Sequence, residues 1–448
     1  MEITTALLAE YIAQRKIQIL RSLFGEYNIV NLAECAQALG IEDILFLLKI
    51  LPKDISGALF SYFSIEKQQE VIEIFNSAQI KEILDNLFTD DITEMLSDLP
   101  ANLQRKVLQA VSAETRKEIN EILSYPENEA GSLMSTDFVE IKNTDTIKKA
   151  IERIKQQGKI AETVTQCYVI DDKRRLVGAL ALQDIMFENQ KEKVADHMDS
   201  DVISVLNHTD QEEVSHTMQR YDLLVVPVVN DENCLIGIIT VDDIMDVIQA
   251  EVTEDIHKMA AIRPLDDSYL KVPVMHMAMS RVPWLLFLMV SATLTGMILT
   301  RYETVLATVP ALAAFVPTIM GTAGNAGQQS AVMVIRGISV DGMKFSDLFS
   351  VVSKESKISF YIAGILFLVS LCRSVFLPPN AALNIAVVVS AAIATAILFA
   401  NVLGGILPLI ALKLKVDPAA MAAPLITTIV DGVTLVVYFF LCTAFLGL

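Results

Sequence analysis

The chain has 448 residues, a hydrophobic fraction of 53% and a formal net charge of −19 at pH 7. Its length suits about three domains, and its mean hydropathy of +0.46 is high for a soluble protein. Residues 1–280 carry 26 basic and 48 acidic side chains, whereas residues 281–448 carry nine basic and six acidic ones. Because so acidic a half repels nucleic acids and attracts cations, we expect no nucleic-acid partner.

The five cysteines are odd in number and lack CxxC spacing: Cys35, Cys167, Cys234, Cys372 and Cys442. This pattern favours a reducing compartment and argues against a disulfide framework or a zinc site. Residues 1–20 form an amphipathic, charge-studded stretch rather than a cleavable signal. We therefore expect the acidic half to stay in the cytoplasm.

Residues 1–130 predict an all-α domain. Apolar residues recur at helical spacing in stretches such as "LAECAQALGIEDILFLLKILP", and Pro52 and Pro100 separate these stretches. Short helices at such regular spacing are typical of a superhelix, whose usual role is contact with other parts of a protein.

An internal repeat follows, over residues 131–194 and 195–249. "CYVIDDKRRLVGALALQDIM" and "VPVVNDENCLIGIITVDDIM" align without gaps at an offset of 59 residues. Each copy contains a strand, a polar turn, a glycine, a second strand and an acidic helix start, and "LMSTDFVEI" or "HMDSDVISV" supplies a further strand upstream. The repeat therefore predicts a paired α/β module.

This pair resembles tandem cystathionine-β-synthase-type (CBS) domains, a sensory module that often takes adenine nucleotides. The resemblance implies a weak nucleotide site at Asp184, Thr240 and Asp243, with ATP as a possible ligand. In the first copy, Ala181 and Gln183 stand where a hydroxyl or basic residue is more usual.

An acidic helical stretch, within "DDIMDVIQAEVTEDIHKMAAI", connects the repeat to the first apolar segment. Its carboxylates fall on neighbouring helical turns: Asp242, Asp243, Asp246, Glu251, Glu254 and Asp255. Like charges at this spacing destabilise a helix unless a cation bridges them. One interpretation is an exposed acidic linker; the other is a cation-sensitive connection, over residues 250–280, that acts on the membrane part.

Residues 281–448 predict a five-helix transmembrane domain, because a span needs about 20 largely apolar residues. The expected spans are Val282–Thr300, Thr304–Ala323, Ile358–Phe376, Ala381–Leu412 and Met421–Leu448. The fourth is long, and Pro408 allows a kink in it. Basic residues between spans two and three and between spans four and five predict that these loops are cytoplasmic. The C-terminus is then outside.

Asp431 lies in the last apolar segment, "PLITTIVDGVTLVVYFFLCTAFLGL". Burying a charge at mid-bilayer costs about 2.5–3.5 kcal/mol, so such residues usually face a bundle interior or an ion path. A structural carboxylate bonded to a neighbouring helix is the alternative interpretation.

The order of these parts resembles the MgtE family of magnesium channels and transporters over the whole chain. The most specific motifs are "YPENEAGSLMSTDFV", "EVTEDIHKMAAI", "RVPWLLFLM", "PTIMGTAGNAGQQSA" and "DPAAMAAPLITTIVDG". The resemblance implies a non-enzymatic, homodimeric protein of the bacterial inner membrane that takes up Mg²⁺. It also implies a helical N-domain, two CBS domains, a connecting "plug" helix and five membrane helices.

The resemblance further implies which residues meet Mg²⁺. Two copies of Asp431 would face one hydrated ion in the pore, and Asn325 is the second pore candidate. Regulatory Mg²⁺ would lock a closed state through acidic residues of the soluble half and one membrane loop: Asp91, Asp210, Glu212, Asp222, Asp243, Asp246, Glu251, Glu254, Asp255 and Asp417.

Two other functions are weighed against this one. The first is a transporter or exchanger of Co²⁺, Ni²⁺ or Zn²⁺, metals that prefer nitrogen and sulfur ligands. The scarcity of histidine, with five residues, and the absence of paired cysteines near the spans argue against it. The second is a membrane-anchored adenine-nucleotide sensor built on the CBS cleft. The sequence contains no P-loop, nucleophile elbow or HExxH pattern, so we expect no enzyme.

Overall fold

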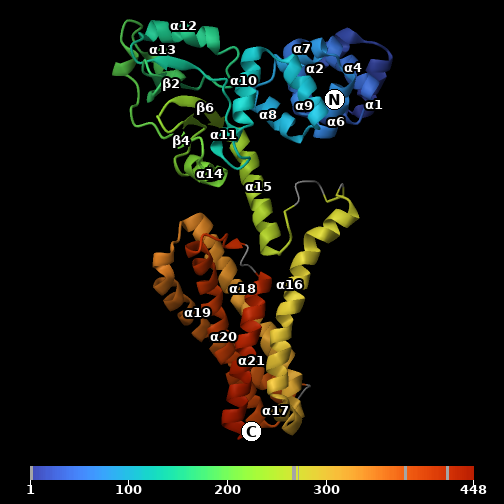
Figure 1. Cartoon of the computed structure of the whole chain (residues 1–448), viewed down its shortest axis with the longest axis vertical. Coiled ribbons are helices and arrows are strands. Elements are labelled where there is room, and N and C mark those ends of the chain that lie inside the picture. Colours follow the sequence, from blue (N-terminus) through green and yellow to red (C-terminus); the bar gives the residue numbers. More distant parts are fainter. Residues whose placement is uncertain (1–3, 265–268, 271, 378–380, 420–422, 448) are drawn as a thin grey trace. The chain divides into compact units, whose positions relative to one another are not determined.

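The computed structural model describes residues 4–264, 269–270, 272–377, 381–419 and 423–447 (Figure 1). The chain divides into two compact units, residues 1–248 and 249–448. The first unit contains an all-α N-domain and the two α/β repeats. The second consists of helices, most of them long and apolar.

Short helices build the N-domain, as the periodicity predicts. They are α1 (Thr5–Ala13), α2 (Ile17–Glu26), α3 (Ile29–Gln37), α4 (Ile41–Ile50), α5 (Lys53–Ser61), α6 (Ile65–Ile74), α7 (Ser77–Leu84), α8 (Thr89–Asp98), α9 (Ala101–Ala110) and α10 (Ala113–Ile122). Helix α11 (Ala130–Leu133) follows and packs in the core of the repeats. Pro52 and Pro100 occupy the N-cap positions of α5 and α9, where a missing N–H costs nothing. Asn76 and Gln79 form a capping box at the start of α7.

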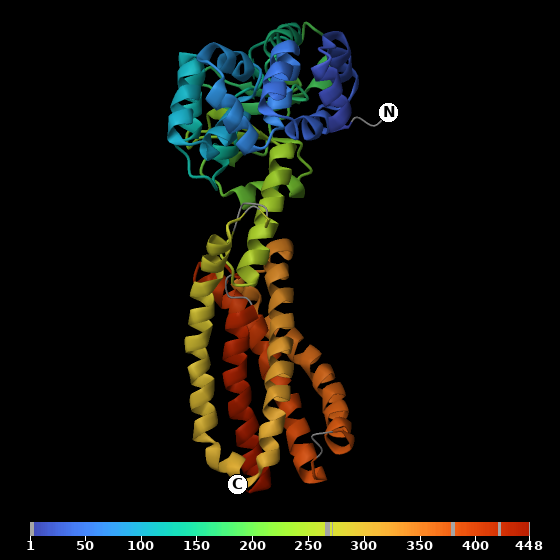
Figure 2. The same cartoon turned by 90° about the vertical axis from the view of Figure 1, so that its right-hand side faces the viewer.

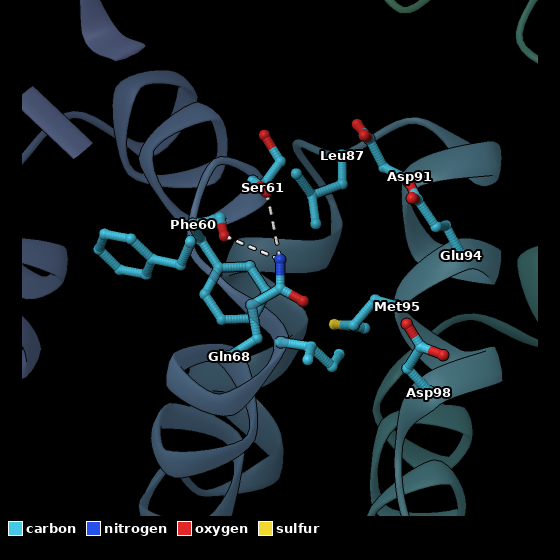
Figure 3. Close-up of a pocket in the computed structure, with 10 residues that line it drawn as sticks. Phe60, Ser61, Gln68, Leu87, Asp91, Glu94, Met95 and Asp98 are labelled. Carbon is cyan, nitrogen blue, oxygen red and sulfur yellow. Dashed lines mark hydrogen bonds between the residues drawn. The ribbon is translucent and has the colours of Figure 1, made fainter. Parts of the chain in front are cut away.

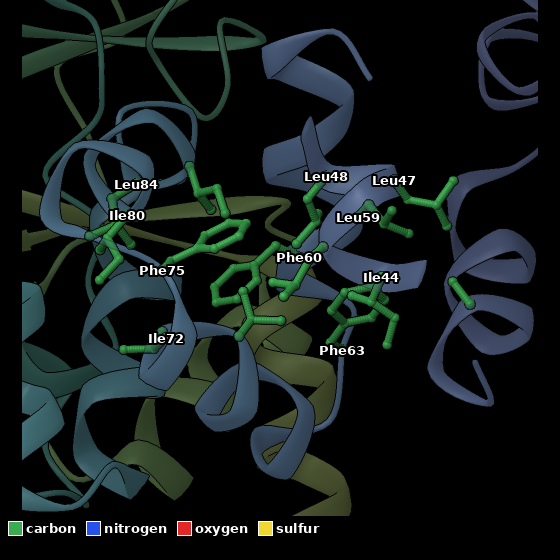
Figure 4. Packing of buried hydrophobic residues seen from close by; sticks show 14 of the residues in the cluster. Ile44, Leu47, Leu48, Leu59, Phe60, Phe63, Ile72, Phe75, Ile80 and Leu84 are labelled. Atoms are coloured by element: carbon green, nitrogen blue, oxygen red, sulfur yellow. The ribbon is translucent and has the colours of Figure 1, made fainter. Parts of the chain in front are cut away.

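The N-domain has one continuous apolar core (Figure 4). Leu47, Leu59 and Phe60 are almost completely buried in it, and Phe60 and Phe63 meet edge to face at 6.5 Å between ring centroids. This core fixes the position of α8, which carries acidic residues on its outer faces.

The two repeats fold alike. Their elements are β1 (Glu140–Lys142), α12 (Ile147–Gln157), β2 (Gln166–Ile170), β3 (Leu176–Ala181) and α13 (Leu182–Phe187), then η1 (Val194–Asp196), β4 (Val205–Leu206), α14 (Gln211–Arg220), β5 (Val225–Val229) and β6 (Leu235–Thr240). The strand orders are β1-β2-β3 and β4-β5-β6, each with a parallel first pair and an antiparallel second pair. The predicted α/β tandem is therefore present.

Equivalent glycines mark the internal symmetry. A Cβ at Gly178 would lie 2.6 Å from the sulfur of Met198, and a Cβ at Gly237 would lie 2.7 Å from the sulfur of Met134. Each glycine thus lets the segment that enters the other repeat cross its sheet closely. The two sheets share a core, and the Tyr168 hydroxyl donates to the Val225 carbonyl at 3.2 Å across it.

The second unit contains the following helices after α15 (Val241–Met259), which crosses the unit boundary: α16 (Val274–Arg301), α17 (Glu303–Thr308), η2 (Pro310–Phe315), α18 (Val316–Asp341), η3 (Phe345–Asp347), α19 (Leu348–Phe376), α20 (Leu383–Lys413) and α21 (Ala423–Leu446). The expected connecting helix over residues 250–280 therefore differs from the observed one. The helix begins at Val241, directly after β6, and ends at Met259.

Five long helices, α16, α18, α19, α20 and α21, run alongside one another in the described part of this unit (Figures 1 and 2). Four helical segments there are long and apolar enough to cross a membrane: Val274–Arg301, Phe345–Phe376, Leu383–Lys413 and Leu425–Leu446. Helix α18 is the fifth long helix and is not among these four apolar segments. Its glycine, asparagine and glutamine residues lower its hydropathy, and their small or amide side chains suit contact with other helices.

The prediction of span two at Thr304–Ala323 is wrong. Residues of that range form α17 and η2, and the long helix starts only at Val316. Pro310 opens η2 and Pro317 lies in the first turn of α18, because proline lacks the N–H that a helix interior requires. Residues 421–422 and 448 of the expected fifth span lie outside the described residues.

Helices α18 and α20 cross at backbone contact. A Cβ at Gly404 would overlap the carbonyl oxygen of Gly327, and a Cβ at Gly327 would lie 3.0 Å from the carbonyl oxygen of Ala400. The Ser330 hydroxyl adds a buried hydrogen bond of 2.7 Å to the Asn401 carbonyl. Small residues at a crossing allow this approach, and van der Waals contact holds it.

Candidate divalent-cation sites

Three carboxylates from three separate segments meet in the first unit. Asp90 lies in the first turn of α8, Glu162 follows α12, and Asp243 lies in the first turn of α15. One oxygen from each lies within 4.8 Å of one from each of the other two, and all three residues are half-buried. We name Asp90, Glu162 and Asp243 the carboxylate triad.

Hydrogen bonds fix the relative positions of the segments that carry the triad. The carboxylate of Asp137 accepts from the Thr89 backbone N–H at 2.8 Å and from the Thr89 hydroxyl at 2.7 Å, which fixes the start of α8. The carbonyl of Asp137 accepts from the Glu162 N–H at 2.8 Å. On the third segment, the Thr240 hydroxyl donates to Oδ2 of Asp243 at 2.7 Å.

The triad is electrostatically unfavourable by itself. Burial, with the nearby charges of Glu162 and Asp243, raises the pKa of Asp90 to about 9. Burial raises the pKa of Glu162 to about 7 and also raises that of Asp243. Among the described residues, one oxygen each of Asp90 and Glu162 is buried without a hydrogen-bond partner. Oxygens of this kind, in a site of like charges, match the ligand preference of a hard divalent cation.

A second acidic surface lies on α8, the helix that carries Asp90. Asp91, Glu94 and Asp98 line a pocket of about 260 Å³ and face Gln68, whose amide donates to the carbonyls of Phe60 and Ser61 at 3.2 Å each (Figure 3). Burial and the charge of Asp243 raise the pKa of Asp91 to about 6, and burial and Asp91 raise the pKa of Glu94.

The acidic residues farther along α15 have other surroundings. Asp246 is exposed in the first unit, where its charge contributes to the raised pKa of Glu94. In the second unit, Lys258 Nζ lies 2.8 Å from the Glu254 carboxylate and 2.7 Å from that of Asp417. An ammonium group therefore already joins the end of α15 to the segment before α21.

Burial, followed by the charge of Asp417, raises the pKa of Asp255. Glu251 lies one turn before Asp255 on α15 and adds a smaller like-charge effect there. Glu251, Glu254, Asp255 and Asp417 thus form one acidic region that Lys258 neutralises in part.

The remaining expected sites do not join these groups. Asp210 caps α14, accepting from the Glu212 N–H at 2.9 Å, so both lie at one helix start. Asp222 has a left-handed backbone, with φ of +52°, and lines a cleft between the repeats. Asp184 is exposed in the first turn of α13.

The expected nucleotide residues do not line the cleft between the repeats. Thr240 and Asp243 bond to each other at the carboxylate triad, and Asp184 is not among the residues that line the cleft. Among the described lining residues none is Lys, Arg or His, whereas Asp199, Asp201 and Asp222 are acidic. The described lining residues of this cleft thus offer no positive side chain to a free polyphosphate.

Asp431 lies on α21 in the membrane unit, at the crossing with α18. A Cβ at Gly324 would lie 3.6 Å from Oδ1 of Asp431 and 3.5 Å from Thr427, so the missing side chain leaves room for the carboxylate. Asn325, the next residue on α18, is exposed in the single chain, and Asp431 is half-buried. The two predicted pore residues therefore belong to neighbouring helices.

A further group, Glu188, Glu192 and His197, was not expected from the sequence. The two ring nitrogens of His197 lie 3.2 Å from Glu188 and 2.6 Å from Glu192. Both ring nitrogens of His197 therefore already contact carboxylate oxygens.

Sequence reasoning also missed Asp90, Glu162, Glu94 and Asp98. Asp90 and Asp91 are adjacent, and only the buried side of α8, marked by Thr89 and Thr93, distinguishes their directions. The buried Thr89 and Thr93 were therefore the sequence signal that could have identified Asp90. Glu162 lies after α12 in a segment without periodicity, so the sequence held no signal for it.

Comparisons with known proteins agree with this arrangement. The family model "Divalent cation transporter" matches residues 316–441, "MgtE intracellular N domain" matches residues 27–128, and "CBS domain" matches residues 130–190 and 194–250. The magnesium transporter MgtE of Thermus thermophilus is 33% identical over 436 residues, covering 96% of each chain. That of Bacillus subtilis is 33% identical over 416 residues, covering 90% of this chain and 91% of the relative.

Two solved structures resemble the soluble part. The soluble part of a magnesium transporter is 32% identical and covers 55% of this chain and 97% of its own, with a TM-score of 0.53. The cytosolic domain of the Mg²⁺ channel MgtE in complex with ATP is 33% identical and covers 54% of this chain and 99% of its own, with a TM-score of 0.50.

An intracellular N domain and two CBS domains followed by an apolar helical unit define a membrane transporter of divalent cations, and not an enzyme. The chain belongs to the MgtE family.

Proposed function

We propose that this chain carries Mg²⁺ across a membrane and that Asp431 meets the ion in the pathway. The observation that carries the proposal is the Asp431 carboxylate, which lies in the apolar segment Leu425–Leu446 and against Gly324 of α18. A fixed negative charge in such a place is costly unless a cation or a pore accompanies it. Relatives named magnesium transporters, 33% identical over nearly the whole chain, support Mg²⁺ as the cargo.

The chemistry of Mg²⁺ suits these residues. The ion keeps several of its waters and takes one or two carboxylates, so nearby oxygens can bind it through water. Asp431 supplies a carboxylate and Asn325 an amide oxygen. In a homodimer with a two-fold axis along the pathway, two copies of each would face the same hydrated ion.

Cytosolic Mg²⁺ is the proposed closing signal. At low Mg²⁺ burial and mutual proximity favour protonated carboxyl groups in the carboxylate triad, and an ion there would take the place of those protons. An ion that binds the closed arrangement more tightly shifts the population toward it. The further acidic residues, Asp91, Asp210, Glu212, Asp222, Asp246, Glu251, Glu254, Asp255 and Asp417, are proposed as weaker contributors to this response.

The proposed orientation follows the basic loops. Lys344 precedes α19 and Lys354 lies in its first two turns, while Lys413 ends α20 and Lys415 follows it. These basic residues favour the cytoplasmic side of a bacterial inner membrane for both helix connections. The soluble unit is then cytoplasmic and the C-terminus outside. ATP is kept as a candidate ligand of the soluble unit, because a relative's cytosolic domain, 33% identical, is solved in complex with ATP.

Mg²⁺ uptake into liposomes tests the transport role. Asp431→Asn should abolish uptake, whereas Asp341→Asn, at the end of α18, is the matched control and should leave it intact. Normal uptake by a correctly folded Asp431→Asn protein would remove Asp431 from the pathway. Uptake of Co²⁺ or Ni²⁺ in preference to Mg²⁺ would instead favour the other divalent-cation function.

A further inference from the structure

Glu188, Glu192 and His197 form a group of metal-ligating side chains that the proposed transport function leaves unused. One ring nitrogen of His197 and one carboxylate oxygen from each glutamate lie within 4.8 Å of one another. The His197 side chain is 21% exposed and the glutamate side chains are 37% and 45% exposed, so an ion from solution can reach them. We name these three residues the histidine–glutamate group.

The contacts of the His197 imidazole call for a cation. Nδ1 lies 3.2 Å from Oε2 of Glu188, and Nε2 lies 2.6 Å from Oε2 of Glu192. A neutral imidazole carries a proton on one nitrogen, and ionised carboxylates accept hydrogen bonds but donate none. One of the two contacts therefore brings two acceptors together unless a second proton or a metal ion lies between them.

Backbone hydrogen bonds hold the segment that carries the group. The Ile147 N–H donates to the Glu192 carbonyl at 2.9 Å, and the Val194 N–H donates to the Asp145 carbonyl at 3.0 Å. The Val194 side chain is completely buried, and the His197 N–H donates to the Val194 carbonyl at 3.1 Å. These bonds anchor the segment to the start of α12. Because the ligands are held together in advance, little ordering free energy opposes ion binding.

The ligand types select a transition metal rather than Mg²⁺. Zn²⁺ binds readily to an imidazole nitrogen together with carboxylate oxygens, and exchangeable zinc sites often combine three protein ligands with one water molecule. Mg²⁺ prefers oxygen ligands throughout. Imidazole affinity also rises along the first transition series, so the group should favour Zn²⁺ over the proposed cargo.

We infer that Glu188, Glu192 and His197 bind one Zn²⁺ ion from solution. The site lies where the first repeat passes into the second: α13 ends at Phe187, and Met198, the residue after His197, packs over Gly178 of the first sheet. A bound ion would fix the chain at this junction. The inference goes beyond the proposed transport function and does not depend on it, because the group belongs entirely to the first unit.

Equilibrium dialysis of the full-length protein in detergent against Zn²⁺, with Mg²⁺ in large excess, tests this inference. Wild type should retain one more Zn²⁺ per chain than His197→Gln does, because Mg²⁺ fills oxygen sites but competes poorly for imidazole. His208→Gln is the matched control and should retain the wild-type amount. His208 lies outside the group, and its Nδ1 is 3.9 Å from the Asp231 carboxylate. Equal Zn²⁺ retention by His197→Gln and wild type would overturn the inference and leave a protonated histidine between two glutamates.

Hydrogen–deuterium exchange of the same protein locates the ion. At a Zn²⁺ concentration of about ten times Kd, amide exchange of segments that open with the site, within residues 188–198, should slow about ten-fold in wild type. Glu192→Gln should lose most of this slowing, while unchanged exchange in zinc-free buffer would show that its fold is intact. Full slowing in a folded Glu192→Gln protein, or no slowing of this segment in wild type, would place the ion elsewhere and refute the assignment.

Discussion

Asp90→Asn separates the ionic role of the carboxylate triad from its structural role. The pKa of Asp90 is raised to about 9, so at pH 7 the side chain is a neutral carboxylic acid, which an amide resembles in shape. In the absence of Mg²⁺ at pH 7, the substitution should therefore change the free energy of unfolding by less than about 1 kcal/mol. With Mg²⁺, only wild-type Asp90 can ionise and bind the cation.

The magnitude follows from ligand linkage. At a Mg²⁺ concentration of about 100 Kd, binding stabilises the ion-bound arrangement by about 2.7 kcal/mol. That free energy corresponds to about a hundred-fold slowing of amide exchange for segments that open when the triad separates. In Asp90→Asn the slowing should fall below about ten-fold, because two carboxylates remain where three bound the ion.

Hydrogen–deuterium exchange of the full-length protein in detergent measures this slowing at the start of α8 and in residues 241–248. Asp231→Asn is the matched control, since its side chain is 84% exposed and lies outside the triad. Equal Mg²⁺-induced slowing in Asp90→Asn and in wild type would refute the assignment of the triad as a cation site.

Three further predictions concern other parts of the molecule. Gly404→Val should lower the thermal unfolding midpoint of the purified protein by several degrees, because its side chain meets backbone of α18, whereas Gly364→Ala, in open space, should have little effect. Lys258→Met leaves the carboxylates of Glu254 and Asp417 without a neighbouring cation, so amide exchange at the end of α15 should become about five-fold faster in ion-free buffer. Added Mg²⁺ should return the exchange rate to the wild-type value. An unchanged exchange rate in the variant would contradict this. Because the pKa values of Asp90 and Glu162 are raised, the folded state holds protons that the unfolded chain has lost, so the free energy of unfolding without Mg²⁺ should fall as pH rises from about 4 toward 9. The stabilisation by Mg²⁺ should grow over the upper part of that range. Chemical denaturation at pH 6 and pH 8, with and without Mg²⁺, checks the sign of both trends.

The sequence predicted the elements whose signals are local or repeated. The 59-residue offset matched both α/β repeats, down to the paired Gly178 and Gly237. The long apolar runs predicted four of the membrane helices. The second span was misplaced because apolar composition continues through η2, while Pro310 and Pro317 decide where the helix begins.

The candidate sites depended more strongly on tertiary contacts. Asp243 was expected, but its partners Asp90 and Glu162 come from segments 153 and 81 residues away in the chain. Adjacent helix residues point about 100° apart, so choosing Asp91 instead of Asp90 selects a different face of α8. The periodicity of a single sequence does not indicate which of those two faces contacts the repeats. Thr240 likewise matched a nucleotide pattern, yet its hydroxyl is engaged by Asp243.

The contact of Gly327 with Gly404 restricts how the membrane unit can rearrange. Rotation of either helix about its axis would replace a glycine at the crossing with a bulkier neighbour, so α18 and α20 should travel as one rigid body. Any conformational cycle that exposes Asp431 alternately to the two sides would then move α21, which carries Asp431, relative to this pair. The interlocked helices supply the fixed frame against which that displacement occurs.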